Sequence, residues 1–409
     1  MTNFGEKLIS QFRATLDECS LETLNTAVRQ IVDAKKRGGK VMVVTGSGPN
    51  IHEGVTTLIA EMIHKGLIDA VSTSSVVVAH EMSGSFEREK RIINRVQRVS
   101  AQALGINPKA MPRGDLFEFT VMQESELDAL EREMILDRGL FSKADTLPRH
   151  SSIIKAAGNM AYSMGLRSEL LATEILKLAQ LYGLTFEETA GYGCDPMTML
   201  GAGAAKGVPV LVTIPQLIGG GRVGMAIGDS IPISRRSMLL AKMLERSDII
   251  IKSAVALVQE MHDDPPECYT GHGIWAWWQG EYTYSLKGKS LIRFDLDENL
   301  RKATDLERAD KTIQEAIDKG LPKTKVANMP FRMEMSTFAR HEGSLPVIGD
   351  IGKIWPVVAY EVARELGVRL DFISASQDTP EGQAMCEWIV NHIKPLNRET
   401  MIKKLRTIT

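Results

Sequence analysis

The sequence predicts an α/β protein built on a doubly wound, mostly parallel sheet with helical insertions. Short apolar runs rich in β-branched residues, such as VMVV at 41–44 and III at 249–251, suit strands buried on both faces of a parallel sheet. Helical patterns separate these runs. Loops rich in glycine or hydroxyl groups follow them, which is the arrangement of a β-α-β nucleotide-binding unit.

Composition and charge narrow the classes of function. The chain has 409 residues, 44% hydrophobic and 24% charged, which fits one large domain with insertions or two to three smaller domains. The formal net charge is −2 and the basic residues are scattered, which argues against a nucleic-acid partner. No apolar run reaches the roughly 20 residues of a membrane helix, and the N-terminus lacks the apolar core of a signal peptide. We expect a cytoplasmic protein without a membrane partner.

The cysteine pattern indicates neither a zinc ribbon nor a disulfide framework. Cys19, Cys194, Cys268 and Cys386 show no C-x-x-C spacing, and we expect no metal site. Cys194 and Cys268 lie among glycines and polar residues, so a reactive thiol remains an alternative to an incidental cysteine.

Three parts of the chain differ in pattern. Residues 1–37 have apolar positions at helical spacing, so we expect a helical arm packed on the sheet or on a second subunit. Residues 38–375 form the α/β domain, with insertions at about 83–150 and 300–342; we expect the first to be a helical cap over the site. A helix is expected to open at 149–152 (RHSS) and run toward Met164. Residues 376–409 form a helical tail.

The segment Lys40–Glu81 is the best candidate for a nucleotide site. A strand at 41–44 leads into the turn TGSGPN at 45–50, and a helix and a second strand at 70–72 follow. Glycines let the backbone approach a ligand closely, and hydroxyl groups after the second strand would bond a ribose or an amide. The candidate cofactor residues in this segment are Thr45, Gly46, Ser47, Gly48, Asn50, Thr73, Ser74 and Ser75. The alternative is an ordinary β-α-β turn, since a G-x-G turn without the third glycine is a weak fingerprint.

Later strand ends carry further candidates. The strand at 207–213 ends in IPQLIGGGRVG, and consecutive glycines at the carboxyl end of a parallel strand favour a ligand there; Gly220 and Gly221 are the candidates for cofactor contacts. Strands are also expected at 248–252, 290–295 and 345–350. Asp350 ends the last of these, where a carboxylate commonly binds ribose hydroxyls.

The segment 269–281 concentrates aromatic residues. It contains His272 between two glycines, three tryptophans and a glutamate. Indoles wall a cationic substrate by cation–π contact, but dense aromatics also suit a subunit interface, and both readings stay open. The candidates are His272, Trp275, Trp277, Trp278 and Glu281.

The order of these motifs resembles one family. VTGSGPNIHEG, LIDAVSTSS, KGVPVLVTIPQLIGGGRVGM and PVIGDIGKIWPVVAYEVA resemble, in that order, segments of deoxyhypusine synthase over most of residues 38–365. Ala79-His-Glu81 is also similar to the V-H-D of the ornithine-cyclodeaminating proteins that share its fold. The resemblance implies an NAD-binding, deoxyhypusine synthase-like Rossmann fold, often a homotetramer with sites between subunits.

The resemblance also implies residue roles. It places Thr45, Ser47, Asn50, Thr73, Ser74, Ser75 and Asp350 around NAD, with Glu81 and the loop 219–222 nearby. The synthase has its catalytic lysine in a W-G-K motif, whereas this chain has WWQGE at 277–281 and lysines only further on, at Lys287 and Lys289. Arg222 replaces an acidic residue, and an arginine suits a substrate carboxylate better than a polyamine.

These observations predict an NAD-dependent enzyme of amine metabolism, acting on a small amine or amino acid through an imine that is hydrolysed, cyclised or transferred, as in a lyase or a transferase. His80 or Glu81 would be the base, His272 and Glu281 would hold the ammonium group, and Arg222 the carboxylate. One alternative is a deoxyhypusine or homospermidine synthase-like aminobutyl transferase. Another is a nucleotide-binding regulatory protein without catalysis, which the missing lysine motif favours.

Overall fold

The computed structural model describes residues 2–46, 49–84, 90–94, 116–121, 152–156, 163–217, 221–253, 286, 288–295 and 344–408. Its centre is a six-stranded sheet in which every neighbouring pair is parallel. The strands are β1 (Val41–Thr45), β2 (Ala70–Thr73), β6 (Val210–Val212), β7 (Ile249–Ser253), β8 (Ser290–Asp295) and β9 (Ser344–Ile348). The predicted α/β fold class is confirmed, and each of the expected strands is present.

The order of the strands defines where a ligand can bind. Across the sheet the order is β6-β2-β1-β7-β8-β9. If the six strands are numbered along the chain, this is the order 3-2-1-4-5-6 of sheets that bind dinucleotides. The order reverses between β1 and β7, which pair from Val41 with Ile249 to Thr45 with Ser253. The crevice outside the carboxyl ends of these two strands is therefore the expected ligand position.

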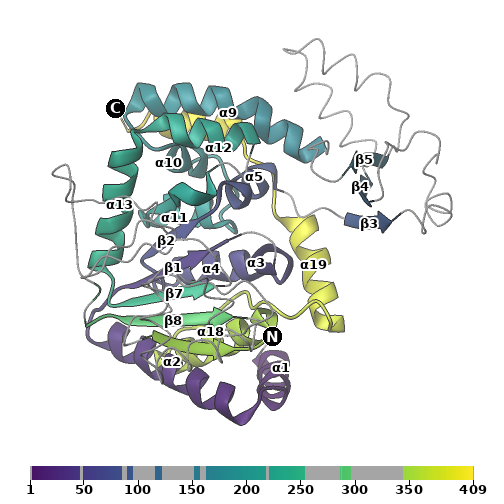
Figure 1. The fold of residues 1–409 in the computed structure, drawn as a ribbon, viewed down its shortest axis with the longest axis vertical. Coiled ribbons are helices and arrows are strands. Elements are labelled where there is room, and N and C mark those ends of the chain that lie inside the picture. Colours follow the sequence, from purple (N-terminus) through teal and green to yellow (C-terminus); the bar gives the residue numbers. More distant parts are fainter. Residues whose placement is uncertain are drawn as a thin grey trace, which may run out of the picture.

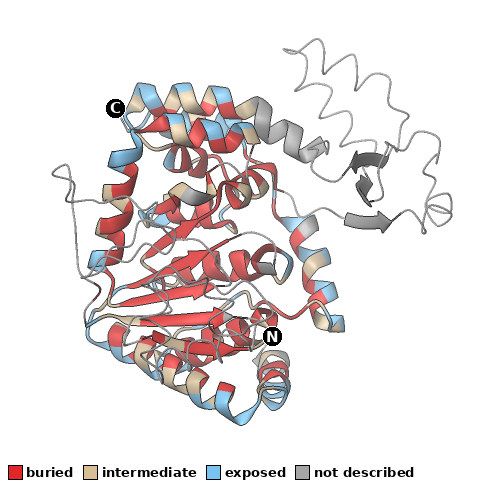
Figure 2. Ribbon diagram, viewed as in Figure 1, coloured by how far each residue is buried: buried red, intermediate tan, exposed pale blue. Residues whose placement is uncertain are grey.

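Apolar side chains cover both faces of the sheet. In β1, Val41 and Val43 belong to the larger core, whereas Met42 and Val44 belong to a smaller core on the opposite face. Figure 2 shows the strands as a buried layer between helices whose outer faces are exposed. Burial on both faces explains why these strands are uninterrupted apolar runs rather than alternating ones.

Helices cover the two faces unequally. The larger core includes residues of α1, α2, α4, α5, α10, α11, α12 and α18, whereas the smaller core draws its helical residues from α13 (Figure 1). The described helices are α1 (Thr2–Ala14), α2 (Glu18–Lys36), α3 (Pro49–His52), α4 (Val55–His64), α5 (Ser75–Ser83), α9 (Ser163–Tyr182), α10 (Phe186–Gly191), α11 (Met199–Lys206), the 3₁₀ helix η4 (Ile214–Gln216), α12 (Gly221–Ser230), α13 (Ile233–Arg246), α18 (Ile351–Glu365), α19 (Pro380–His392) and α20 (Arg398–Leu405). Contacts of α2 with β1, β7 and β9 bring the N-terminal helices onto the sheet.

Side-chain caps fix where several helices begin. The hydroxyl of Ser74 accepts a hydrogen bond from the Val77 N–H at the start of α5, and Thr198 does the same for Gly201 in α11. Asp350 accepts from the Gly352 N–H at the start of α18. Such caps satisfy N–H groups that have no partner within the helix, typically stabilising it by about 1 kcal/mol.

A second, small sheet corrects one expectation. The strands β3 (Lys90–Asn94), β4 (Leu116–Val121) and β5 (Ser152–Ala156) pair in antiparallel order. The helix expected from 149 onward is wrong, since 152–156 form β5 and α9 begins only at Ser163. The described part of the insertion after α5 contains the strands β3 and β4, and the expected helical cap over the site stays a prediction. Because SIIKA offers only a short apolar run, its pattern fits a strand as well as a helix.

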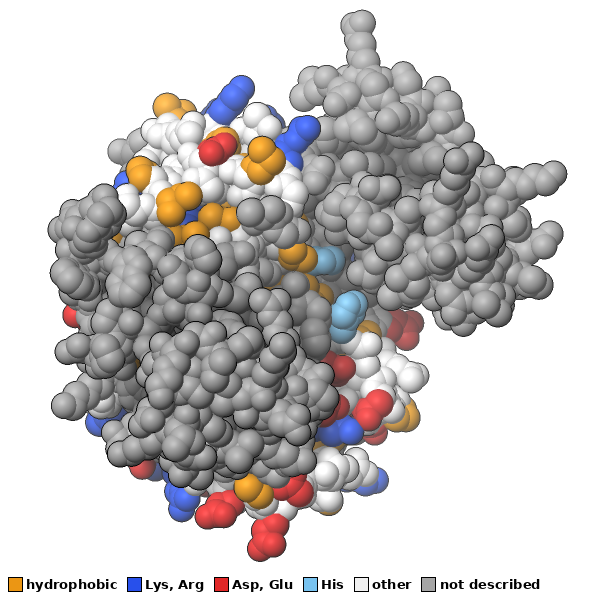
Figure 3. Space-filling view, in the orientation of Figure 1, with side chains coloured by type: hydrophobic (Ala, Val, Ile, Leu, Met, Phe, Trp, Pro, Cys, Tyr) orange, Lys and Arg blue, Asp and Glu red, His pale blue; other side chains and the backbone are white. Residues whose placement is uncertain are grey.

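Two features concern the surface. Among the described helices, none combines the length and the apolar character needed to cross a bilayer. On the face drawn in Figure 3, basic and acidic side chains both reach the surface, and apolar side chains are exposed over α9 and α12. Leu181 and Met225, on those two helices, are among the most exposed large apolar residues. The homotetramer implied by the resemblance stays a prediction.

Candidate functional site

The candidate site lies at the carboxyl ends of β1 and β7, where a hydrogen-bonded group joins the two strand ends. The Asn50 amide nitrogen donates to the Ser253 carbonyl at 3.1 Å, and the Ser253 hydroxyl donates to the Asn50 amide oxygen at 2.5 Å. The Trp355 indole N–H donates to the same hydroxyl at 2.7 Å. All three side chains are buried. Asn50, a predicted cofactor residue in α3, thus ties the start of that helix to the end of β7.

Buried hydroxyl groups without a hydrogen-bond partner concentrate in the β1–α4–β2 unit. Thr45 ends β1 and Thr73 ends β2, and each is about 1% exposed. Within the described chain, the unpaired buried hydroxyls of this unit are those of Thr45, Thr56, Thr57, Ser72 and Thr73. Leaving such a group unpaired costs about 1–3 kcal/mol, and each case needs an explanation. A ligand rich in hydrogen-bonding groups at the strand ends supplies one.

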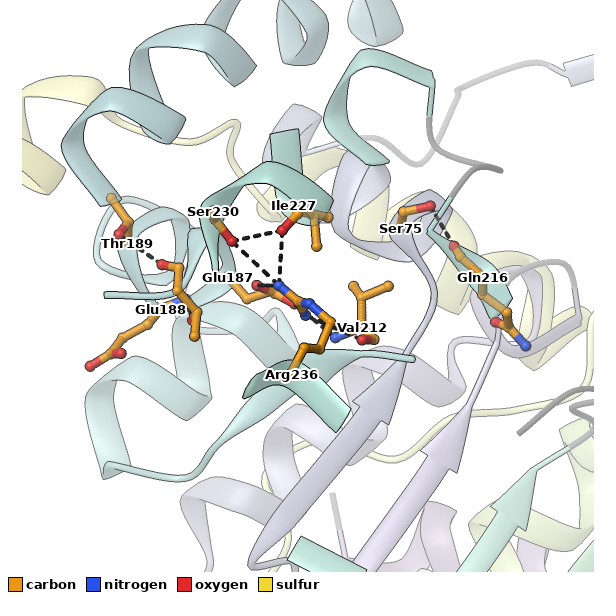
Figure 4. A network of polar contacts seen from close by, with 10 residues as sticks. Ser75, Glu187, Glu188, Thr189, Val212, Gln216, Ile227, Ser230 and Arg236 are labelled. Atoms are coloured by element: carbon orange, nitrogen blue, oxygen red, sulfur yellow. Dashed lines mark hydrogen bonds and ion pairs between the residues drawn. The ribbon is translucent and has the colours of Figure 1, made fainter. Parts of the chain in front are cut away.

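The end of β2 is tied to the segment that follows β6. Ser74 caps α5, and the Ser75 hydroxyl donates to the Gln216 carbonyl at 2.6 Å (Figure 4). The hydroxyl groups of these two predicted cofactor residues therefore already form hydrogen bonds within the protein. Thr73 is the residue of the three whose hydroxyl is unpaired.

A buried ion pair holds the end of β6 (Figure 4). Arg236 on α13 and Glu187 on α10 are completely buried, and their nearest atoms are 2.5 Å apart. The Val212 N–H donates to Glu187 at 2.8 Å, and Arg236 donates to the Val212 carbonyl at 3.2 Å. Arg236 also donates to the Ile227 carbonyl on α12 at 3.0 Å. Since β6 is an edge strand, the pair takes the place of a neighbouring strand at its last residue.

The helix α12 begins close to the end of β2. Gly221, its first residue, has φ of +58°, which a glycine adopts without strain. A Cβ atom on Gly224 would lie 1.7 Å from the Leu217 carbonyl oxygen and 3.2 Å from the Ser75 hydroxyl. The first turn of α12 therefore packs directly on the segments that follow β6 and β2. Arg222, the predicted carboxylate ligand, is exposed on this turn.

The structure gives Glu81 a structural role. Its two carboxylate oxygens accept hydrogen bonds from the Met199 and Leu200 N–H groups, both at 2.9 Å, at the start of α11. Burial raises the pKa of Glu81 to about 7, and the two backbone hydrogen bonds oppose that rise. This geometry argues against Glu81 as the base, whereas His80 beside it is only partly buried.

Asp350 lies at the outer edge of the sheet. It follows β9, which β7 and β8 separate from β1, so it is about 14 Å from the end of β1. Its carboxylate accepts from the Gly352 N–H at 2.9 Å and from the Ser376 hydroxyl at 2.8 Å. The structure does not bring Asp350 together with Thr45 and Thr73, and a role in capping α18 accounts for its position.

Lys289 lies at the amino ends of the strands, whereas the candidate site lies at their carboxyl ends. It precedes Ser290, the first residue of β8, and donates to the Glu245 carbonyl and, at 2.7 Å, to the Ser247 carbonyl. These carbonyls end α13, where a cation is favourable. Burial lowers the pKa of Lys289. Its position argues against Lys289 as a replacement for the synthase lysine.

Several predicted residues lie outside the described residues. They are Ser47, Gly48, Gly220, His272, Trp275, Trp277, Trp278, Glu281 and Lys287. Gly46 is described and is buried directly after β1. Of the two candidate thiols, Cys268 is also outside, and Cys194 is buried with its pKa raised well above the usual value by desolvation, which favours an incidental cysteine.

Sequence reasoning did not identify four buried residues near the strand ends. Ser253 and Trp355 complete the group around Asn50. Lys252 of β7 and Arg293 of β8 are in register and nearly inaccessible to solvent, and both make polar contacts. The sequence does carry a signal for Lys252 and Arg293, because each is a charged residue inside an apolar strand, in IIIKS and SLIRFD.

Two further features carry no site. A groove of about 590 Å³ lies between α1, α2 and α18, but Arg13 pairs there with Glu361 at 2.6 Å and Glu6 accepts a hydrogen bond from the Tyr360 hydroxyl. The described residues contain no cluster of three His, Cys, Asp or Glu side chains able to hold a metal ion.

Similarity to known proteins is found among solved structures. No protein-family model matches the chain, and no curated protein matches it either. Among solved structures, the chain is similar to a ternary complex of AgrE with ornithine and NAD+ (11% identity, TM-score 0.40), to a complex of an AgrE mutant with L-arginine (11%, 0.38) and to a LOR/SDH protein from Methanococcus maripaludis S2 (11%, 0.36). These matches cover 86%, 86% and 83% of this chain, and 34%, 34% and 67% of the other chains. The chain thus spans about a third of the AgrE chains.

Proposed function

We propose that this protein binds NAD at the carboxyl ends of β1 and β2 and acts as an enzyme on a small amine or amino acid. The observation that supports the cofactor most strongly is the pair of unpaired, buried hydroxyls of Thr45 and Thr73, at adjacent strand ends of a sheet with dinucleotide-binding order. A ribose or a phosphate offers partners for both hydroxyls.

The residues present fit such a group. Asn50 binds Ser253 at the end of β7, so the start of α3 is held beside the switch point of the sheet. Two features depart from the usual fingerprint: the third glycine is missing, and α3 forms only a short turn before α4. Hydroxyl groups, rather than a glycine-rich loop alone, would therefore carry much of the recognition.

The proposed chemistry concerns a carbon that bears nitrogen. Bound NAD would supply a hydride acceptor for that carbon. Of the two neighbouring candidates for the base, His80 is the better one, because Glu81 is committed to α11. His272 and Glu281 remain the proposed ligands of the ammonium group. The imine of the substrate would then be hydrolysed, cyclised or transferred to a second amine.

The cofactor proposal is tested by removing the two hydroxyls. Thr45→Val and Thr73→Val keep the shape of the side chain, and each should weaken NAD+ binding about 5–10-fold because one hydrogen bond to the ligand is lost. Each should also leave the apo protein as stable or more stable, since the hydroxyl it removes has no partner. Calorimetric titration and thermal unfolding measure both effects.

The control is Thr26→Val on α2, where the hydroxyl bonds the Glu22 carbonyl far from the strand ends. It should leave NAD+ affinity unchanged. If the wild-type protein neither retains NAD on purification nor gains thermal stability from added NAD+, the proposal fails. If Thr45→Val and Thr73→Val lower apo stability instead, the two hydroxyls serve the fold rather than a ligand.

A second candidate function is a nucleotide-binding regulatory protein without catalysis. The positions of Glu81 and Lys289 favour it, because both are bound to helix termini rather than placed at the switch point. NADH absorbance during incubation with a panel of amines and amino acids separates the two functions. Formation of NADH with any member establishes an enzyme, and silence across the panel with intact NAD+ binding favours the regulator.

A further inference from the structure

The end of β2 is where dinucleotide-binding sheets distinguish NAD from NADP. A carboxylate there binds the 2′-hydroxyl of the adenosine ribose, whereas a nearby arginine accommodates a 2′-phosphate. In this protein Thr73 and Ser74 occupy the end of β2, and neither carries a charge. The position therefore lacks the group that repels a 2′-phosphate.

The sequence around this position is free of acidic residues. Neither the segment 70–80 nor the segment 208–228 contains Asp or Glu. The Glu187 carboxylate lies near the end of β6, but Arg236 neutralises it within the core. No negative charge from these segments opposes an anion at the end of β2.

A cation lies on the neighbouring segment. The Ser75 hydroxyl binds the Gln216 carbonyl, and Gly224 packs against Ser75, so the first turn of α12 adjoins the end of β2. Arg222 is exposed on that turn, at the positive end of a ten-residue helix. The unpaired Thr73 hydroxyl is an independent sign that a polar ligand group is expected here.

We propose that the cofactor site accepts a dinucleotide with a 2′-phosphate, NADP, and that Arg222 contacts this phosphate. The inference rests on the proposed function and refines it. It also revises the role of Arg222. Because β6 and β2 lie on the opposite side of β1 from β7, Arg222 is on the adenosine side of the crevice, away from the position of a substrate carboxylate.

The test compares NADP+ and NAD+ binding to the full-length protein by calorimetric titration at about 0.15 M salt. NADP+ should bind at least as tightly as NAD+. Arg222→Met should weaken NADP+ binding about 10–100-fold, the loss expected for a charge-assisted phosphate contact, and change NAD+ binding less than about threefold. Arg235→Met, which removes an exposed arginine of α13, is the matched control and should leave both affinities unchanged.

A second variant tests the same position from the side of β2. Ser74→Asp keeps a residue that caps α5 well, and it places a carboxylate at the strand end. It should lower the NADP+ to NAD+ affinity ratio at least about tenfold by repelling the phosphate and binding the 2′-hydroxyl.

The outcomes separate this inference from the proposed function. If NAD+ binds and NADP+ binds more than tenfold more weakly, or if Arg222→Met lowers both affinities equally, the 2′-phosphate assignment is overturned while the dinucleotide site stands. If neither nucleotide binds, both proposals are wrong.

Discussion

At the scale of the residue, burial decides the role of each titratable group. Glu81 was a reasonable candidate for a base, yet both of its oxygens bind the start of α11. Lys289 was a candidate for the missing lysine, yet it binds the end of α13. In both cases the side chain forms hydrogen bonds with backbone groups at a helix end, which accounts for its position without a catalytic role.

The raised pKa of Glu81 predicts a loss of stability as pH rises. The folded protein holds this proton up to about pH 7, whereas an unfolded glutamate loses it near 4.5. Its stabilising contribution is therefore complete below about pH 4.5 and disappears as pH rises through 7, a change on the order of 3 kcal/mol. Urea unfolding at pH 5 and pH 8.5 measures the difference.

Glu81→Gln should reduce that pH dependence, because the amide does not titrate. Glu22→Gln, at an exposed position of α2, should leave it as in the wild-type protein. An unchanged pH dependence in Glu81→Gln would show that Glu81 ionises normally in the fold.

The Glu187–Arg236 pair predicts a non-additive pair of mutations. Arg236→Met leaves the Glu187 carboxylate buried without its cation, and should cost about 3–5 kcal/mol of unfolding free energy. The double variant Glu187→Gln/Arg236→Met buries no charge and still offers an oxygen to the Val212 N–H. It should be more stable than the single variant in urea unfolding, and equal or greater loss in the double variant would contradict this account.

At the scale of the element, close packing of α12 positions the segments on the adenosine side of the site. Gly224 approaches the Leu217 carbonyl so closely that any side chain displaces the helix. In contrast, a Cβ atom on Gly228 of the same helix would meet only the Leu217 side chain at 3.9 Å. The same helix therefore has one position, Gly224, that excludes a larger side chain and another, Gly228, that accommodates one.

Gly224→Ala should destabilise the protein by roughly 1–3 kcal/mol through overpacking and should weaken dinucleotide binding. Gly228→Ala should instead stabilise it by up to about 1 kcal/mol, because alanine favours a helix interior. Thermal unfolding and nucleotide titration of the two variants check both directions. Equal effects of the two substitutions would show that α12 does not pack on the segment after β6 as described.

At the scale of the whole molecule, the six strands of the parallel sheet were predicted, but their order and the small antiparallel sheet were not. Runs such as VMVV at 41–44 and III at 249–251 indicate buried strands from local sequence alone. The hydroxyl groups at the end of β2 indicate that ligands bind at the carboxyl ends of the strands. The segment SIIKA at 152–156 was assigned to a helix, because a serine pair before a short apolar run also resembles a helix start. Pairing of β3, β4 and β5 depends on segments far apart in the chain.

The fold class, the six strands of the main sheet and the hydroxyl-rich strand ends follow from the sequence, because apolar runs and loop composition are local properties. The strand order, and with it the set of strand ends that share the crevice, is visible only in the folded chain. That order places Thr45 beside Thr73 and Arg222 near the end of β2, whereas Asp350 lies at the outer edge of the sheet and Lys289 at the amino ends of its strands. Position in a parallel sheet depends on crossover connections, which neighbouring residues do not encode.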